Sequence, residues 1–273
     1  MIRLVFLWIA AWLISNRTIA ATVDTIWVES ATMKRSFRCV VVVPGPDQHN
    51  NARLPVTYLL HGYGGDYSNW IKKVPALTRY ADQFRMMIVC PEGQNNWYIN
   101  SPVVDSIRWE TYIAQELPAY IDSHYPTIAD RKARAITGLS MGGHGGLYLG
   151  LKRSEVFGAC GSMSGGVDLL PFPNKWQLNQ LLGDPVTQAE NWRRFSVMQL
   201  TDEPIKQPIA MIVDCGTEDF FFAVNEALHR KLSEKKIAHD YIVRPGKHDW
   251  SYWQQALPYQ LLFFNRFFYG AIG

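Results

Sequence analysis

The feature that most constrains this chain is the pentapeptide Gly138-Leu-Ser140-Met-Gly142, because of what surrounds it. An apolar strand is predicted at 133–137, directly before it, and a helix at 142–152, directly after it. A Gly-x-Ser-x-Gly turn between strand and helix is so tight that only glycine fits on both sides of the serine. The turn lifts the hydroxyl above a sheet and directs the helix N-terminus toward it. The pattern predicts a nucleophilic Ser140, against the alternative of an inert serine in a Gly-rich turn.

Apolar, β-branched runs alternate with helical patterns along the chain, which is typical of βαβ units and a mostly parallel sheet. Two antiparallel lead-in strands are expected at 22–29 and 35–43. Further strands are predicted at 55–60, 86–90, 133–137, 159–163, 209–214 and 241–243, and helices at 109–125, 142–152, 222–236 and 250–268. Residues 171–200 are polar and irregular, and we expect a cap-like excursion over the sheet edge. Without repeats or linkers, residues 22–273 are predicted to form a single domain with the sheet flanked by helices.

A second Gly-rich string, Leu60-His-Gly-Tyr-Gly-Gly65, follows the apolar strand predicted at 55–60. In enzymes with a nucleophilic turn of this kind, the loop after the third strand supplies one backbone N–H to the oxyanion hole. The glycines allow backbone N–H groups to turn inward, so we assign this hole to the N–H groups of Tyr63 and Met141. An ordinary strand-to-loop turn is the alternative. His61 is expected to shape the loop, because the catalytic base comes last in the chain order of such sites.

The order serine, acid, histidine directs the search for the base to the C-terminal third of the chain. His248 lies in the loop Pro245–Trp250, just past the last predicted strand, and is our candidate base. Loops at the carboxyl edge of a sheet are where such folds place reactive groups. Other histidines fit less well by position: His229 and His239 are expected on the surface, and His124 and His144 come too early.

The acid is expected in the loop after the preceding strand, where Asp214, Glu218 and Asp219 compete. Asp214 ends the strand and can instead shape the turn, while Glu218 is expected to face solvent. Asp219 lies deepest in the loop, and the neighbouring rings of Phe220 and Phe221 can shield a carboxylate–imidazole pair from water. We therefore choose Asp219, with the role of holding the tautomer of the histidine.

Residues 1–21 have the organisation of a secretory signal peptide. Arg3 precedes the apolar run Leu4–Ile14, and Ile19-Ala-Ala21 offers small residues for cleavage. The run of about eleven residues is too short to span a bilayer core of roughly 30 Å. Arg17 leaves an uncleaved anchor as the alternative. We expect cleavage, no stable membrane insertion afterwards, and a secreted or periplasmic location.

Composition limits the classes of partner. The net charge is only +3 and no Lys/Arg block stands out, which argues against nucleic acid. Cys39, Cys90, Cys160 and Cys215 are widely spaced, without a CxxC or Cys/His ligand pattern, so no metal site is expected. Buried free thiols are predicted at all four positions, and one disulfide is the alternative.

Together these motifs resemble the esterase D family, which includes S-formylglutathione hydrolases, bacterial feruloyl and acetylxylan esterases and the mycobacterial mycolyltransferase antigens. The resemblance spans Leu54–Phe267. It rests on Leu60-His-Gly-Tyr-Gly-Gly-Asp66, Pro91-Glu-Gly93, Gly138-Leu-Ser-Met-Gly-Gly143, Asp214-Cys-Gly-Thr-Glu-Asp219 and Gly246-Lys-His-Asp-Trp-Ser-Tyr-Trp253. Membership implies an α/β-hydrolase fold, the triad Ser140, Asp219 and His248, and neither a metal nor an organic cofactor.

The resemblance implies short or aromatic acyl groups on sugars, thiols or small alcohols as substrates. Export shifts the expectation toward external material, such as esters linked to plant polysaccharide. Trp70, Trp97 and Trp250 lie near the motifs and are candidates for a wall that stacks on a feruloyl or sugar ring. Trp253 is expected to pack in the core.

Three alternatives to an esterase remain at the level of sequence. An acyltransferase would pass the acyl group to a carbohydrate in place of water. A catalytically inactive binding module would keep only the scaffold, which the intact serine, acid and histidine argue against. A peptidase could use the same triad, although no propeller domain typical of such peptidases is present in the sequence.

Overall fold

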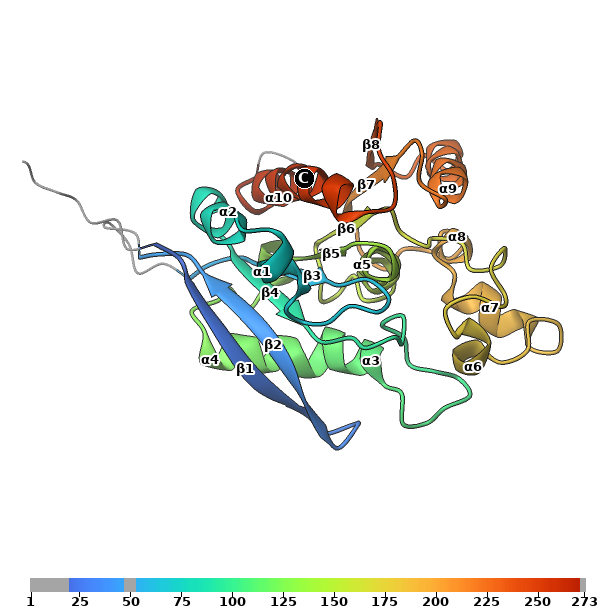
Figure 1. Ribbon diagram of the computed structural model, residues 1–273, viewed down its shortest axis with the longest axis horizontal. Coiled ribbons are helices and arrows are strands. Elements are labelled where there is room, and N and C mark those ends of the chain that lie inside the picture. Colours follow the sequence, from blue (N-terminus) through green and yellow to red (C-terminus); the bar gives the residue numbers. More distant parts are fainter. Residues whose placement is uncertain (1–19, 47–52, 271–273) are drawn as a thin grey trace, which may run out of the picture.

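The computed structural model describes residues 20–46 and 53–270 (Figure 1). In this part of the chain an eight-stranded sheet has the order β1-β2-β4-β3-β5-β6-β7-β8. The strands are β1 (Thr22–Ser30), β2 (Arg35–Val43), β3 (Val56–Leu60), β4 (Met87–Pro91), β5 (Arg134–Gly138), β6 (Ala159–Met163), β7 (Ala210–Gly216) and β8 (Asp240–Arg244). The expected leader, residues 1–21, lies outside the described residues apart from its last two.

The strand directions agree with the sequence pattern. β1 pairs antiparallel with β2, and β2 pairs antiparallel with β4. From β4 onward all neighbouring strands are parallel. Every residue of β3, β4, β5 and β6 is buried, as expected for parallel strands covered on both faces. The predicted mostly parallel sheet with antiparallel lead-in strands is confirmed.

Helices cover both faces of the sheet and create two apolar cores. One face carries α1 (Asn69–Lys73), α2 (Leu77–Phe84) and α10 (Trp250–Phe268). The other carries α3 (Trp109–Thr111), α4 (Leu117–His124), α5 (Met141–Lys152) and α9 (Phe222–Glu234). Figure 1 shows α2 and α10 above the sheet and α3 and α4 below it. This is the single-domain, flanked-sheet architecture of an α/β-hydrolase.

Two helical segments differ from the sequence-based expectation. The helix predicted at 109–125 contains a π-helical stretch, η1 (Tyr112–Glu116), which separates α3 from α4. Pro118 follows in the first turn of α4, where its missing N–H costs least. The helices α1 and α2 were not predicted, although Leu77, Ala81 and Phe84 have helical spacing and are buried. A short 3₁₀ turn, η2 (Arg131–Ala133), leads into β5.

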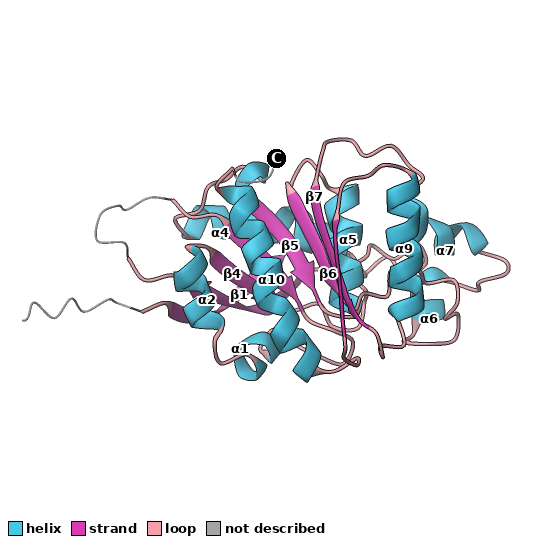
Figure 2. Ribbon diagram, turned by 90° about the horizontal axis from the view of Figure 1, so that it is seen from above, coloured by secondary structure: helices cyan, strands magenta, loops and turns pink. Residues whose placement is uncertain are grey.

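The irregular segment at 171–200 forms three short helices, α6 (Leu178–Leu182), α7 (Ala189–Phe195) and α8 (Val197–Leu200). They bury Leu178, Leu182, Trp192 and Phe195, and α8 packs against α5. Figure 2 shows α6 and α7 beside α9, at one end of the molecule. Residues 171–200 therefore add to the helical layer on the side of the sheet that carries α5. They also bring the residues before α6 close to the carboxyl ends of the strands.

The four cysteines lie within the described residues, and so do all the helices searched for a membrane span. Cys39, Cys90, Cys160 and Cys215 are all buried and free, so the predicted free thiols are confirmed. No helix between residues 20 and 270, among those described, is long and apolar enough to span a bilayer.

Candidate active site

Ser140 lies in a strained turn between β5 and α5. Its backbone has φ 56° and ψ −117°, a conformation that is costly for a non-glycine residue. A Cβ atom on Gly142 would lie 2.6 Å from the carbonyl oxygens of Leu60 and His61, and one on Gly138 would lie 2.6 Å from that of Leu60. Only glycine is small enough at these two positions, as the pentapeptide predicted. The N–H of Ser140 donates to Met163 in β6 at 2.9 Å, which holds the turn in place.

His248 lies between Ser140 and Asp219. Its Nε2 is 2.9 Å from Oγ of Ser140, and its Nδ1 is 2.8 Å from Oδ2 and 3.0 Å from Oδ1 of Asp219. An ionised carboxylate only accepts hydrogen bonds, so Nδ1 carries the proton and Nε2 accepts from the serine hydroxyl. The structure thus brings together the three side chains that the sequence placed in three separate loops.

The surroundings of this pair limit access by water. The side chain of Asp219 is fully buried, and its Oδ1 also accepts the N–H of Phe221 at 2.8 Å. The rings of Phe221 and Trp253 lie 5.4 and 5.0 Å from the imidazole, and both are buried. Phe220 covers the outer side at 4.2 Å and is 56% exposed. The predicted shielding by both phenylalanines and the buried position of Trp253 are present in the structure.

The competing carboxylates lie elsewhere. Glu218 is exposed, as predicted, and pairs loosely with Lys247 at 3.7 Å. Asp214 is fully buried, but it contacts Arg244 and Tyr252 and none of the three site residues.

The competing histidines also have other partners. His229 and His239 contact each other at 2.8 Å between α9 and β8. His124 is exposed and contacts the carbonyl of Tyr120. His144 is buried behind the turn, and its Nε2–H donates to the carbonyl of Phe195 at 2.8 Å. None of these four imidazoles contacts the serine.

The two residues assigned to the oxyanion hole are Met141, which follows Ser140 directly, and Tyr63, whose neighbour Gly62 packs against Ser140. Met141 is the first residue of α5, whose opening N–H groups have no partner within the helix. Gly62, next to Tyr63, lies so close that a Cβ there would be 3.4 Å from the Cβ of Ser140. In the described part of the chain, neither the N–H of Tyr63 nor that of Met141 has an acceptor. Both groups are therefore available to an oxygen atom bound at the serine.

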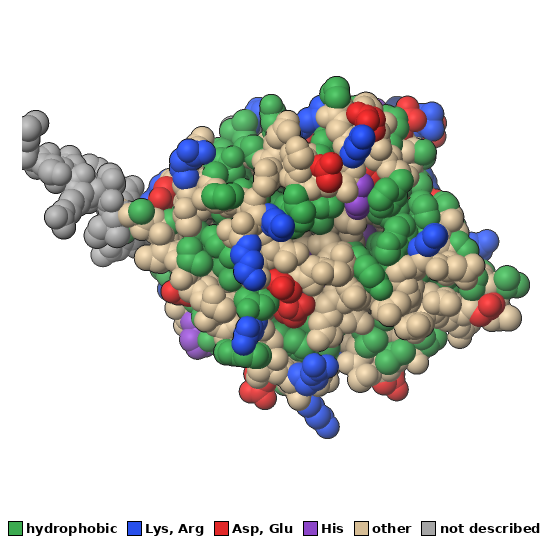
Figure 3. Space-filling view, in the orientation of Figure 1, with side chains coloured by type: hydrophobic (Ala, Val, Ile, Leu, Met, Phe, Trp, Pro, Cys, Tyr) green, Lys and Arg blue, Asp and Glu red, His purple; other side chains and the backbone are tan. Residues whose placement is uncertain are grey.

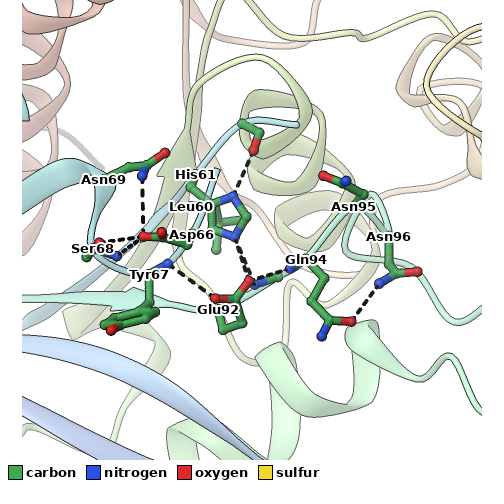
Figure 4. A network of polar contacts seen from close by, with 12 residues as sticks. Leu60, His61, Asp66, Tyr67, Ser68, Asn69, Glu92, Gln94, Asn95 and Asn96 are labelled. Atoms are coloured by element: carbon green, nitrogen blue, oxygen red, sulfur yellow. Dashed lines mark hydrogen bonds and ion pairs between the residues drawn. The ribbon is translucent and has the colours of Figure 1, made fainter. Parts of the chain in front are cut away.

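His61 shapes the loop that carries Tyr63, as the sequence predicted (Figure 4). Its Nδ1–H donates to the carbonyl of Gly62 at 2.8 Å, and its Nε2 accepts the N–H of Gly93 at 2.9 Å. Glu92 lies beside the ring at 3.4 Å. Burial acts to raise the pKa of the Glu92 carboxyl, but hydrogen bonds from its surroundings outweigh burial and lower it. The imidazole thus joins this loop to the end of β4.

Asp66 holds the turn that leads from the same loop into α1. Oδ1 of Asp66 accepts the N–H and the hydroxyl of Ser68, at 2.7 and 2.5 Å, and contacts the amide of Asn69 at 3.3 Å. The N–H of Gly64 donates to the side chain of Asn95 at 2.7 Å. The loop around Tyr63 is therefore held on both sides by side-chain hydrogen bonds.

The structure corrects the predicted tryptophan wall at two of its three positions. Trp70 is fully buried, and its Nε1–H donates to the carbonyl of Leu60 at 3.0 Å. Trp97 is 1% exposed and lies against His144 and Trp176. Because both rings are enclosed by protein, neither offers a face to a ligand. Trp250 is half-buried, so its role as a substrate contact remains a prediction.

A different aromatic pair borders the histidine. The half-buried ring of Trp176 stacks on Phe220 at 6.0 Å and 21°, and Phe220 in turn contacts His248. Trp176 comes from the irregular segment before α6, in which the sequence analysis assigned no residue to the site. The space-filling view shows histidine atoms exposed between hydrophobic side chains on this face of the molecule (Figure 3). Within the described residues, no three His, Cys, Asp or Glu side chains are placed to hold a metal ion.

The sheet order, the turn at Ser140 and the hydrogen-bonded histidine define an enzyme of the α/β-hydrolase class. Residues 30–264 match the Esterase family model, described as "Putative esterase". The chain belongs to this family and is a carboxylic ester hydrolase.

Individual relatives agree with this assignment. The chain is 24% identical over 253 residues to an acetyl esterase of Caldicellulosiruptor saccharolyticus, covering 84% of this chain and 92% of that one. A ferulic acid esterase structure is similar with a TM-score of 0.78 and 28% identity, covering 91% of this chain and 99% of the other. An S-formylglutathione hydrolase from Staphylococcus aureus has a TM-score of 0.79 at 21% identity, covering 90% and 99%, and it supports the fold.

Proposed function

We propose that this enzyme hydrolyses carboxylic esters through Ser140 as nucleophile, His248 as general base and Asp219 as the group that orients the imidazole. The observation that carries the proposal is the continuous hydrogen-bonded chain from Asp219 through His248 to Ser140, with distances of 2.8 and 2.9 Å. The position of Ser140 also supports the nucleophilic role. Its tight, strained turn between strand and helix exposes the hydroxyl above the sheet, where a substrate can reach it.

The proposed cycle has two halves. Nε2 of His248 takes the proton of Ser140 while Oγ adds to the ester carbonyl. The resulting oxyanion accepts hydrogen bonds from the N–H groups of Tyr63 and Met141, each of the kind whose loss costs about 3–4 kcal/mol of transition-state stabilisation. The imidazolium then protonates the leaving alcohol, and an acyl-enzyme forms. Water attacks this acyl group with the same imidazole as base, which releases the acid and restores Ser140.

For the substrate we propose short acyl or feruloyl esters of carbohydrates. The similarity to an acetyl esterase and to a ferulic acid esterase supports these two acyl classes. The wall formed by Phe220 and Trp176 supports an aromatic or sugar ring near the scissile bond, because flat apolar faces stack on such rings. Trp250 is proposed to contribute from the side of α10.

The test is a panel of acetyl, butyryl, longer acyl and feruloyl esters. We expect preference for acetyl and feruloyl esters, and a loss of about 10⁴-fold or more in kcat for Ser140→Ala. Ser123→Ala, which removes an exposed hydroxyl on α4, is the control and should keep full activity. Unchanged turnover by Ser140→Ala would overturn the mechanism. Repeating the assay with a carbohydrate acceptor separates hydrolysis from acyl transfer, because transfer yields an acylated sugar in place of free acid.

We also propose that the enzyme acts outside the cytoplasm, after removal of residues 1–21. The proposal rests on the signal-like organisation of this segment. Mass spectrometry of the protein recovered from a secreting host should give an N-terminus at Ala21 or Thr22. Recovery of the full-length chain in the membrane fraction would instead support the uncleaved anchor.

A further inference from the structure

Asp214 is a second buried carboxylate close to the site, and the proposed cycle does not use it. It lies in β7, five residues before Asp219, and is fully buried. Its Oδ1 accepts the hydroxyl of Tyr252, and its Oδ2 pairs with Nη2 of Arg244. Its backbone carbonyl accepts the N–H of Ser164, at the end of β6, at 2.7 Å. Such an arrangement is costly to bury unless every partner is present.

The two side-chain partners of Asp214 bracket the loop that carries His248. Arg244 is the last residue of β8, four positions before the histidine, and Tyr252 lies in α10, four positions after it. One carboxylate therefore holds both ends of the loop. The loop itself has no helical or strand hydrogen bonding between these two residues until α10 begins at Trp250.

Backbone contacts join the same loop to the segment that carries Asp219. The N–H of Thr217 donates to the carbonyl of Arg244 at 3.0 Å, and that of Glu218 donates to the carbonyl of Gly246 at 2.9 Å. A Cβ atom on Gly246 would overlap the ring of Tyr252, so the tyrosine packs directly on the loop backbone. The loop that carries Asp219 and the loop that carries His248 are thus joined to each other, and Asp214 is the buried polar residue at their centre.

The charge state of this centre suits the role. Burial raises the pKa of the Asp214 carboxyl to about 6, while the bond from Tyr252 and the charge of Arg244 act to lower it. Above pH 7 the carboxylate is therefore ionised and fully paired with Arg244. The guanidinium is held in turn by the carbonyl of Gln255 at 3.2 Å and by the ring of Tyr259 at 4.3 Å.

We propose that Asp214 is a positioning residue that fixes His248 relative to Ser140 and Asp219 by fastening both ends of the His248 loop to β7. The inference rests on the proposed function of Ser140 and His248. It goes beyond that function because Asp214 contacts neither of them. A catalytic geometry that is displaced by about 1 Å can lose about 100-fold in rate, so the fastening matters for turnover.

The test compares Asp214→Asn and Tyr252→Phe with the wild-type enzyme at pH 8 on an acetyl ester. We expect kcat to fall about 10- to 100-fold in both variants, with KM for the small acetyl ester within about twofold, because neither Asp214 nor Tyr252 is one of the proposed substrate contacts. The proton NMR signal of His248 Nδ1–H, downfield in the wild type because of its bond to Asp219, should broaden or disappear. Tyr252→Phe removes a single hydroxyl and keeps the test valid if Asp214→Asn does not fold.

Asp122→Asn is the matched control. Asp122 also accepts from an arginine and a hydroxyl, Arg134 at 2.6 Å and Thr127 at 2.7 Å, but it lies in α4 and contacts the amino end of β5, where Arg134 is the first residue. It should lower the unfolding temperature without changing kcat or the Nδ1–H signal. If kcat and the signal in Asp214→Asn and Tyr252→Phe match those of Asp122→Asn, the inference is overturned. Activity in Ser140→Ala would instead overturn the proposed function, so the two failures are distinguishable.

Discussion

The ring of Phe220 lies 4.2 Å from the imidazole of His248, tilted by 40°, and more than half of its surface is exposed. Binding pockets are lined mainly by hydrophobic and aromatic side chains, so an exposed ring in contact with the imidazole is well placed to contact a ligand. The ring belongs to the residue directly after Asp219, so one short segment supplies both the carboxylate that contacts the imidazole and this exposed ring.

Phe220→Ala and Trp176→Ala are therefore expected to change substrate preference. Each should raise KM for a feruloyl ester about 2- to 10-fold, the worth of one aromatic contact, and leave KM for an acetyl ester nearly unchanged. Steady-state kinetics on the two esters measures the difference. Trp27→Ala, which removes another exposed ring far away on β1, is the control and should alter neither value. Equal effects on both esters would contradict an aromatic-specific role.

Asp219→Asn tests the orienting carboxylate. The amide can hold the imidazole in the wrong tautomer, so we expect kcat to fall by about 10⁴-fold, as in other serine hydrolases with this exchange. Glu218→Gln, one residue away and exposed, should keep wild-type kcat. Single-turnover measurements on both variants check the prediction. A loss shared equally by the two variants would assign the effect to the loop as a whole.

Trp70→Phe separates packing from substrate binding. The exchange keeps an aromatic ring but removes the Nε1–H that donates to the carbonyl of Leu60. We expect the free energy of unfolding to fall by about 1–3 kcal/mol, from the lost hydrogen bond and the smaller ring in a fully buried site, while KM stays the same for every ester. Urea denaturation and the ester panel measure the two quantities. A selective rise of KM for feruloyl esters would contradict the packing role and support Trp70 as a substrate contact.

His144 gives a pH prediction. Burial lowers its pKa from 6.5 to about 4, although its bond to the carbonyl of Phe195 acts in the opposite direction. The unfolded chain therefore binds a proton between pH 6.5 and 4 that the folded chain does not. The stability contributed by the neutral imidazole is complete above pH 6.5 and is lost as the pH falls toward 4, up to about 3 kcal/mol.

Urea unfolding at pH 7, 5.5 and 4.5 checks this prediction with His144→Gln, which keeps an N–H donor but does not titrate. The stability difference between wild type and variant should shrink or reverse as the pH falls. His124→Gln removes an exposed histidine and should follow the wild type. A difference that does not change with pH would rule out the buried titration of His144.

Most elements could be predicted because their signals are local. Alternation of apolar runs located the eight strands to within a few residues, since parallel strands buried on both faces are apolar throughout. The helices α1 and α2 were missed because five and eight residues give too short a pattern beside a Gly-rich loop. The π-helical stretch in 112–116 was missed because it shares its side-chain pattern with an ordinary helix.

The polar members of the site could be predicted, and so could the rings of Phe220 and Phe221, but the tryptophans that border the site could not. Ser140, Asp219 and His248 were predicted from a turn motif, from the chain order of such sites and from loops at strand ends. All three signals are visible in the linear sequence. Trp70 lies beside the same motifs in sequence, yet its ring points into the core formed with α10. Proximity in sequence does not tell which side of a helix or loop faces the substrate.

The sequence by itself determined the class of fold, the nucleophilic turn and the order in which acid and base follow it, because strand periodicity and glycine geometry depend only on neighbouring residues. The tertiary structure alone decided that Trp176 stacks on Phe220 beside His248 and that Asp214 contacts both ends of the His248 loop. Both depend on the order of β6, β7 and β8 in the sheet, and the second also depends on how α10 packs against β6 and β7. Side-chain burial is a property of that packing, and no local pattern specifies it.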